Sequence, residues 1–205
     1  MKVTIRSPEV KMKQTFMNIT AEKRNRVIKV SMEAFIEYGY ENASTNYIVK
    51  TLGISKGSLF KYFETKYDLY VYLVHRVNDQ LLDFIQNKMV INTSSWKERI
   101  LHFAGVEFDF LIEHRRAYDF YHQMIKDLSH PELKQLKNEL EMASSHYFNR
   151  IFEDLKLEDD FIHHLIFVVS GYNQLFIKKG TAFIEEDKKV YLKGLEVHLN
   201  YVRRH

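Results

Sequence analysis

Residues 55–61, Ser-Lys-Gly-Ser-Leu-Phe-Lys, place small and cationic side chains at the start of a short predicted helix. Lys56 and Lys61 carry positive charge, and the hydroxyl of Ser58 both donates and accepts hydrogen bonds. Such side chains bind phosphate oxygens and the edges of bases in the major groove of DNA. The chemistry predicted here is therefore non-covalent recognition of a nucleic acid.

A glycine turn divides the surrounding sequence into two short predicted helices. The first spans about residues 45–52 and ends at Gly53, because glycine adopts the left-handed backbone that such a turn needs. Ser55 is a preferred N-cap residue for the second helix, at about residues 56–62. This order of helix, turn and helix is that of a helix-turn-helix DNA reader, whose second helix contacts base edges with its N-terminal residues.

Helical spacing predicts which sides of these two helices are buried. The predicted apolar side of the first helix consists of Tyr47, Ile48, Thr51 and Leu52. In the second helix, Leu59 and Phe63 lie four residues apart and are expected to face the core. Gly57 weakens that helix by about 1 kcal/mol relative to alanine. Its presence has two explanations: close approach of the backbone to DNA, or a tight contact with the preceding helix.

A third helix is predicted to begin at Lys66. Thr65 and Asp68 have the spacing of a capping box, with Asp in place of the usual Glu or Gln. Lys66 lies in the first turn, where a cation opposes the helix dipole. A DNA phosphate as partner would rationalise that placement, and a solvated surface lysine is the alternative.

Taken together, residues 26–69 resemble the DNA-binding segment of the TetR family of bacterial transcriptional regulators. The residues that carry the resemblance are Arg26, Ile28, Phe35, Gly39, Tyr40, Ser44, Thr45, Ile48, Gly53 to Leu59, Phe63, Lys66 and Leu69. It implies an all-α fold, with an N-terminal three-helix helix-turn-helix head joined to a C-terminal helical bundle for ligand binding and dimerisation. It also implies a repressor, released from a palindromic DNA operator by a small molecule.

The resemblance further implies roles for individual residues. Those that would face the major groove are Lys56, Ser58 and Lys61. Those that would contact the DNA backbone are Thr45, Tyr62 and Lys66. The complete predicted DNA-binding set is Ser44, Thr45, Ser55, Lys56, Gly57, Ser58, Phe60, Lys61, Tyr62 and Lys66. Phe60 departs from the family, which usually has Tyr there, and this puts one phosphate contact in doubt. Ser31 and Val49 stand where Ala is common.

Composition restricts the class of protein. The net charge of the 205-residue chain is +3, and residues 1–70 alone carry +5, from 12 Lys and Arg against 7 Asp and Glu. A basic N-terminal part suits attraction to phosphate. The chain has no Cys, which excludes a disulfide scaffold and a thiolate zinc site. Motifs for a nucleophile elbow, a P-loop or a dinucleotide site are absent, so we expect neither an enzyme nor a cofactor.

The rest of the sequence predicts helices and no strands. Their approximate ranges are 66–89, 95–114, 116–128, 131–155, 159–179 and 185–204. We expect a DNA-binding domain at residues 20–66 and a ligand-binding and dimerisation domain at residues 67–205. Residues 1–19 are expected to be a flexible extension, with a minor-groove arm or an extra helical turn as alternatives. No apolar run is near 18 residues and the start lacks a signal peptide, so we expect a cytoplasmic protein without a membrane partner.

Two groups of residues in the body of the protein are candidates for binding. The last two helices are expected to pair with their copies in a homodimer, through Phe161, Leu165, Val168, Gly171, Tyr172, Leu195, Leu199 and Val202; burial within their own domain is the alternative. The middle helices are rich in aromatic residues with polar groups between them, as in a site for a hydrophobic small molecule. The candidate ligand residues are His102, Phe103, Phe110, Tyr121, His122, His146, Tyr147, Tyr172 and Asn173.

A metal site is the alternative from a different class. Asp-x-x-His, which places both side chains on one face of a helix, occurs as Asp119/His122, Asp127/His130 and Asp160/His163. Carboxylate-bridged di-iron bundles use a related Glu-x-x-His pair on two helices together with two further Glu. A metal sensor or metalloenzyme therefore stays open beside the DNA-binding regulator, although no metal ligands are assigned.

Overall fold

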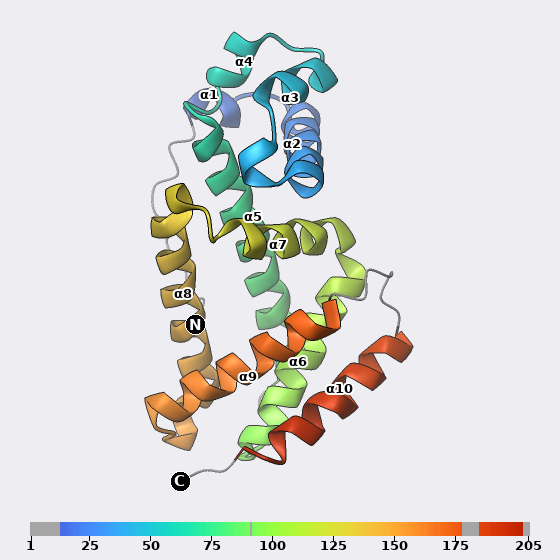
Figure 1. The fold of residues 1–205 in the computed structure, drawn as a ribbon, viewed down its shortest axis with the longest axis vertical. Helices are drawn as coiled ribbons and strands as arrows, with labels where there is room; N and C mark the ends of the chain where they lie inside the picture. The colour runs from blue at the N-terminus through green and yellow to red at the C-terminus, as the bar shows by residue number, and fades with distance from the viewer. Residues whose placement is uncertain (1–12, 91, 178–184, 203–205) are drawn as a thin grey trace. The chain divides into compact units, whose positions relative to one another are not determined.

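All regular structure in the described part of the chain is helical (Figure 1), which confirms the predicted all-α class. The computed structural model describes residues 13–90, 92–177 and 185–202, without the side chains of Ser144, His146, Ser170 and residues 174–177. The α-helices are α1 (Gln14–Met17), α2 (Ala21–Asn42), α3 (Thr45–Leu52), α4 (Lys56–Phe60), α5 (Lys66–Lys88), α6 (Trp96–Glu113), α7 (Arg115–Asp127), α8 (Lys134–Phe152), α9 (Asp159–Ile177) and α10 (Glu185–Leu199). Two short 3-10 turns, η1 (Pro131–Leu133) and η2 (Glu153–Leu155), precede and follow α8.

The chain forms two compact units, and neither is one continuous segment. Unit 1 comprises residues 1–80 and 116–137, and unit 2 comprises residues 81–115 and 138–205. Helices α5 and α8 therefore each contribute to both units. Unit 1 contains the predicted three-helix head together with α7, so the division does not follow the predicted functional boundary at residue 66.

Aromatic side chains from helices that are distant in sequence meet in the core of unit 1. Phe35 on α2 packs edge-on against Tyr70 on α5, with 4.9 Å between ring centroids, and Tyr70 also lies 5.7 Å from Phe120 on α7. Ile48 of α3 is completely buried. Aromatic side chains bury large areas and prefer such tilted contacts, so these rings fix the head helices against α5 and α7.

Residues 13–18 belong to this core, contrary to the predicted flexible extension. Phe16 is fully buried, and its ring centroid lies 4.8 Å from that of Phe63 and 5.5 Å from that of Tyr72. The backbone N–H of Lys13 donates to the carbonyl of Tyr62 at 3.0 Å. The extra helical turn, α1, is therefore the correct alternative for this part, because one buried aromatic anchors it; the prediction for residues 1–12 lies outside the described residues.

A kink near the end of α2 depends on Gly39. Its φ of 70° and ψ of 173° are non-helical, and a side chain is strained at such a positive φ. A Cβ placed there would also lie 3.0 Å from Oδ1 of Asp127 and 3.0 Å from Nε2 of Gln123, both on α7. Glycine therefore serves both the turn of the backbone and the close approach of α7.

Unit 2 has a core of its own, formed where α6, α9 and α10 pack together. Helix α10 packs against α6 and α9, and its Tyr191, Leu195 and Leu199 are buried. The guanidinium of Arg99 on α6 is almost fully buried and donates to the carbonyls of Thr93 and Ile151 at 2.7 Å and 2.8 Å. It also forms a bidentate ion pair with the carboxylate of Asp154. The side chain of Arg99 therefore connects α6 to the end of α8, through Ile151, and to η2, through Asp154.

None of the described helices combines the length and the apolar character that crossing a membrane requires.

Candidate nucleic-acid interface

The first helix of the reader begins and ends as its sequence predicts. The hydroxyl of Ser44 accepts a hydrogen bond from the N–H of Asn46 at 3.2 Å, so Ser44 is the N-cap of α3. Gly53 terminates the helix in the left-handed region, at φ 68° and ψ 32°, and its N–H bonds back to the carbonyl of Lys50. The chain can thus reverse within one residue and start α4 close by.

The buried side of α3 differs from the predicted one. Ile48 and Leu52 are buried as expected, but Val49 is the third buried residue. Tyr47 is 42% exposed, with its ring 5.5 Å from that of Tyr38, and Thr51 lies on the exposed side. Spacing alone did not separate these faces because the apolar stripe of an eight-residue helix is only two turns long.

Helix α4 turns one face to the core and leaves its first residues open. The hydroxyl of Ser55 accepts from the N–H of Ser58 at 3.1 Å, which confirms the predicted N-cap. Leu59 and Phe63 are 2% and 1% exposed, as their spacing predicts. The residues on the exposed or half-exposed side are Lys56, Gly57, Ser58, Phe60 and Lys61. The structure therefore presents the predicted reading residues together on one surface.

The environment of Gly57 bears on one of its two explanations, a tight contact with the preceding helix. A Cβ at this position would meet only the hydroxyl oxygen of Ser55, at 3.9 Å, among the described atoms. No contact with α3 requires a glycine here. The described contacts therefore give the packing explanation no support, and close approach of DNA to Gly57 stays a prediction.

Lys56 and Phe60 form one continuous patch of this surface. The Nζ atom of Lys56 lies 5.9 Å from the centroid of the Phe60 ring, within the range of a cation–π contact. Phe60 lacks the hydroxyl that a tyrosine would offer to phosphate. Its ring instead contacts the ammonium group of Lys56. Phe60 therefore has a role on this surface beside Lys56, and the loss of one phosphate contact stays a prediction.

Lys66 has protein partners that its sequence position does not reveal. Its ammonium donates to the carbonyls of Tyr40 and Glu41 at 2.7 Å and 3.0 Å, at the end of α2. It also lies 4.7 Å from the centroid of the Tyr40 ring. A cation stabilises the C-terminus of a helix, so Lys66 caps α2 and its predicted phosphate contact stays a prediction.

The capping box at the start of α5 is confirmed. The backbone N–H of Thr65 donates to the carboxylate of Asp68, and the backbone N–H of Asp68 donates to the hydroxyl of Thr65.

A compact three-helix head with a solvent-facing second reading helix defines a helix-turn-helix DNA-binding regulator. A profile of the family described as bacterial regulatory proteins, tetR family, matches residues 27–73. The chain is 21% identical, over 82% of its length and 75% of the relative, to an HTH-type transcriptional activator, FasR, of Mycolicibacterium smegmatis. It is 40% identical over 68 residues, 33% of this chain and 37% of the relative, to an HTH-type transcriptional regulator of Staphylococcus aureus.

The similarity in fold extends over nearly the whole chain. A TetR family transcriptional regulator from Chloroflexus aurantiacus superposes with a TM-score of 0.71 at 22% identity, over 95% of this chain and 99% of that one. Residues 27–73 thus carry the DNA-binding domain of the TetR family of transcriptional regulators, and the chain as a whole has the fold of that family's regulators. Proteins of this family are regulators and not enzymes, which agrees with the sequence-based prediction.

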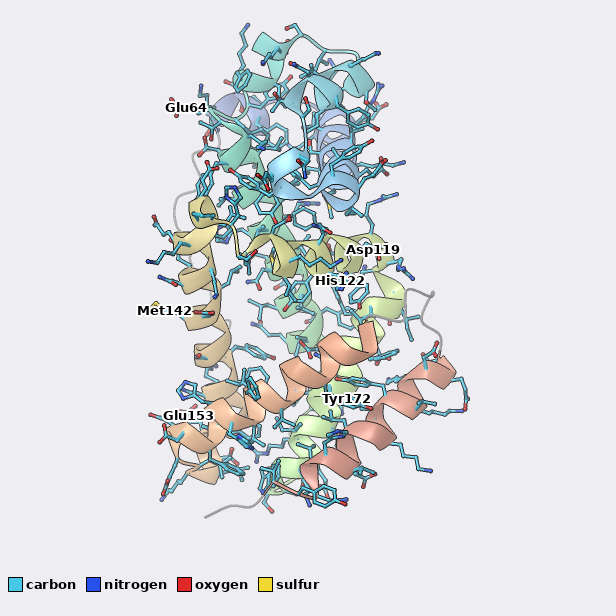
Figure 2. All side chains as sticks on the ribbon, in the orientation of Figure 1. Glu64, Asp119, His122, Met142, Glu153 and Tyr172 are labelled. Atoms are coloured by element: carbon cyan, nitrogen blue, oxygen red, sulfur yellow. The ribbon has the colours of Figure 1, made fainter. Side chains whose placement is uncertain are left out.

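Four of the candidate ligand residues belong to one group in unit 2. In unit 2, Phe103 is buried beside Tyr147 and Phe148, and Tyr172 lies between Tyr191 and His198, with ring centroids 5.3 Å and 5.1 Å away. Figure 2 labels Tyr172, which belongs to α9 and reaches the backbone of Gly194 on α10. Asn173 bonds to Glu107 and Tyr191. These residues form an aromatic group with polar members.

Four other candidates have different neighbours within their own units. Tyr121 and His122 belong to unit 1, where His122 stacks on Tyr118 at 6.3 Å and burial lowers its pKa. Phe110 contacts Phe84 and His114 instead. The side chain of His102 is exposed and accepts a bond from the N–H of Val90 at 3.3 Å. The ninth candidate, His146, has a side chain outside the described residues.

Sequence reasoning missed Glu107 and Tyr191, which complete the aromatic group in unit 2. Glu107 accepts a hydrogen bond from Asn173 at 3.4 Å, and Tyr191 donates to the same amide. A signal for Glu107 was available: it is an acid placed four residues after Phe103 in the apolar segment of α6, where i and i+4 share a face.

The predicted dimer residues separate into core and surface. Leu165, Leu195 and Leu199 are completely buried within unit 2, so they have no surface to offer to a second copy. The half-exposed ones are Phe161, Val168, Gly171, Tyr172 and Val202. Among the described side chains of α9, Phe167 is a large apolar residue with 76% exposure, and it is not one of the predicted interface residues.

The Asp-x-x-His pairs do not assemble into a metal site in the described residues. No group of three or more potential ligands that could hold a metal ion is found there. The carboxylate of Asp127 is instead engaged by Tyr40, Tyr70 and Gln123. The comparisons and this geometry give the metal alternative no support.

Proposed function

We propose that this regulator is a homodimeric, cytoplasmic repressor that leaves a palindromic DNA operator when a mainly hydrophobic small molecule binds to its body. The observation that carries the DNA-binding part is α4, with Lys56 and Lys61 exposed while Leu59 and Phe63 are buried. A recognition helix needs this division, because one face must pack and the other must enter the major groove.

Dimerisation has a geometric purpose in this proposal. Two recognition helices read successive major grooves only when they are held about 34–36 Å apart. Phe167 and Gly171 lie four residues apart on one side of α9, and no described atom lies within 4 Å of a Cβ built at Gly171. An exposed phenyl ring beside an open glycine suits close packing of a second helix. We therefore centre the proposed interface on these two residues, with Val168 at its edge.

The effector is proposed to act by shifting a population of conformations. It must bind the DNA-incompetent geometry of the dimer more tightly than the competent one. Helix α5 begins in the head at Lys66 and continues into unit 2, and α7 follows α6 directly in the chain. A displacement in unit 2 could therefore reach the head in two ways, along α5 or through the chain connection from α6 to α7.

The test is fluorescence anisotropy of the purified protein on the DNA upstream of its own gene, with scrambled DNA of equal length as control. We expect selective binding whose logarithmic affinity falls with the logarithm of salt by about 0.9 per phosphate neutralised. Equal binding to both DNAs across the salt series would contradict an operator in that region, and selection from a random library would then locate one.

The sign of regulation is tested separately by transcription in vitro from the bound promoter. The proposal predicts less transcript with the protein present and recovery when an effector is added. An increase in transcript would contradict repression and would place this chain with the Mycolicibacterium relative, which is named as an activator.

A further inference from the structure

Three polar side chains from three helices meet inside unit 2. The Oε2 atom of Glu107 on α6 accepts a hydrogen bond from the amide nitrogen of Asn173 on α9 at 3.4 Å. The amide oxygen of Asn173 in turn accepts a hydrogen bond from the hydroxyl of Tyr191 on α10. The amide is thus held from one side by α10, and it turns its donor toward the carboxylate.

Aromatic rings surround these three polar groups. The ring of Tyr191 lies 5.0 Å from that of Phe108 and 5.3 Å from that of Tyr172. Tyr147 is close enough to interact with Glu107: burial, and then the charge of Glu107, raise the pKa of Tyr147 to about 12. Tyr147 in turn lies 6.1 Å from Phe103. We call Glu107, Asn173, Tyr191, Tyr172, Tyr147 and Phe103 the acidic aromatic cluster.

Among the described residues, Glu107 lacks the cationic partner that Asp109 and Glu113, on the same helix, both have. Asp109 pairs with Lys188 at 2.5 Å, and Glu113 pairs with Lys88. In the described part of the chain, no basic group lies within 4 Å of the Glu107 carboxylate. A carboxylate that is largely removed from water and has no counter-charge is unfavourable in its charged form. Burial accordingly raises the pKa of Glu107 to about 7. The hydrogen bond from Asn173 has the opposite, smaller effect and lowers this pKa.

The carboxylate is nevertheless within reach of a ligand. Glu107 keeps an intermediate exposure, as do Tyr147, Tyr172 and Asn173. Its neighbours offer the negative faces of aromatic rings, which attract cations. A neutral hydrophobic ligand would use the rings but would leave the acid without a charge partner. A ligand that carries a positive charge among apolar groups satisfies both parts of the cluster.

We propose that the acidic aromatic cluster binds an organic cation, a quaternary ammonium or phosphonium ion or a protonated amine carrying aromatic or alkyl groups. Glu107 neutralises the charge, the rings of Tyr147 and Tyr172 cover the apolar groups, and Asn173, held by the buried Tyr191, orients the carboxylate. This inference rests on the proposed effector-responsive function and narrows its effector from hydrophobic molecules in general to hydrophobic cations.

Isothermal titration of two ions of nearly equal size and opposite charge tests the assignment on the unmodified protein. Tetraphenylphosphonium should bind, and tetraphenylborate should bind at least tenfold more weakly. Benzyltriethylammonium serves as a smaller cation, in case the larger one does not fit. Binding of the anion as tight as that of the better cation, or failure of both cations to bind, would overturn the proposal.

Two variants locate the site. Glu107→Gln keeps the size of the side chain and an acceptor for Asn173, and it should weaken cation binding at least tenfold. Asp109→Asn removes a carboxylate two residues away that is already paired with Lys188, so its cation affinity should stay within twofold of the wild type. Thermal unfolding confirms that each variant folds. Equal cation affinity of Glu107→Gln and the wild type would overturn the role of Glu107.

DNA binding, measured by anisotropy on the selected operator, distinguishes this inference from the proposed function. A neutral aromatic compound that releases the operator while both cations fail to bind would overturn the cation class and leave the effector-responsive function standing. Cations that bind through Glu107 without changing operator affinity would confirm the site and contradict its role as an effector site.

Discussion

The carboxylate of Asp127 accepts a hydrogen bond from the hydroxyl of Tyr70 at 2.9 Å. The same oxygen accepts from the backbone N–H of Tyr40 at 3.0 Å, and the other oxygen accepts from Gln123. One acid at the end of α7 thereby holds the turn after Gly39 on α2 and the first half of α5. Burial, and then the charge of Asp127, raise the pKa of Tyr70 far above its usual value, so its hydroxyl stays a donor.

Replacing Asp127 tests this attachment. Asp127→Ala leaves the Tyr40 N–H and the Tyr70 hydroxyl without their acceptor, and we expect a loss of about 2–4 kcal/mol in the free energy of unfolding. Tyr70→Phe removes only one donor together with its need for a partner, so its loss should be about 1 kcal/mol. Urea titrations followed by circular dichroism measure both. Equal losses in the two variants would contradict the shared role of Asp127.

Lysines of the reading helix should carry DNA affinity without carrying stability. Lys56→Ala or Lys61→Ala should weaken operator binding by about 1–3 kcal/mol if the side chain reads a base, with unfolding midpoints unchanged because both side chains are exposed. Lys193→Ala removes an exposed charge from α10 in unit 2 and is the matched control. Unchanged operator affinity in both head variants would exclude α4 as the recognition helix.

The buried guanidinium of Arg99 should be required for the stability of unit 2. Arg99→Ala leaves the carbonyls of Thr93 and Ile151 without donors, and we expect a cost of about 2–4 kcal/mol. Arg99→Lys keeps the charge but not the planar fork that reaches Asp154 and both carbonyls, so it should recover only part of that loss. Chemical unfolding of the three proteins checks the order wild type, Lys variant, Ala variant; full recovery by lysine would contradict the fork geometry.

Glu107 should make stability depend on pH. Its pKa in the folded protein, about 7, is above the ordinary value of 4.5, so the folded state retains a proton that the unfolded chain releases. The contribution is complete below pH 4.5, declines as the pH rises to 7, and is constant above that, with a total of roughly 3 kcal/mol. The difference in unfolding free energy between wild type and Glu107→Gln, measured from pH 4 to 8, should follow this decline. A difference that is flat with pH would contradict the raised pKa.

Ser31 offers a stabilising substitution. Its hydroxyl is fully buried in the middle of α2 and has no hydrogen-bond partner among the described atoms. Ser31→Ala removes this unsatisfied group and improves helix propensity, so we expect a gain of up to about 1 kcal/mol in the free energy of unfolding. Differential scanning calorimetry measures the change. A clear loss of stability would show that the hydroxyl has a partner, such as a buried water.

The sequence by itself determined the all-α class and the position of the helix-turn-helix formed by α3 and α4. Ser44, Gly53, Ser55 and the Thr65–Asp68 box act on their immediate neighbours, and the structure shows each cap and turn where its residue type places it. Caps and turns are local, because a side chain bonds to backbone groups within a few residues, and such signals can be interpreted without knowledge of the fold.

Only the tertiary structure decided which residues act across the chain. Phe16 packs against Phe63 and so anchors α1. The ammonium group of Lys66 donates to the carbonyl of Tyr40 and so caps α2, although the sequence suggested a phosphate or solvent as its partner. Glu107 meets Asn173 on a helix 66 positions later. Each of these contacts depends on how helices pack, and the spacing of residues within one helix carries no information about which partner helix its face will meet.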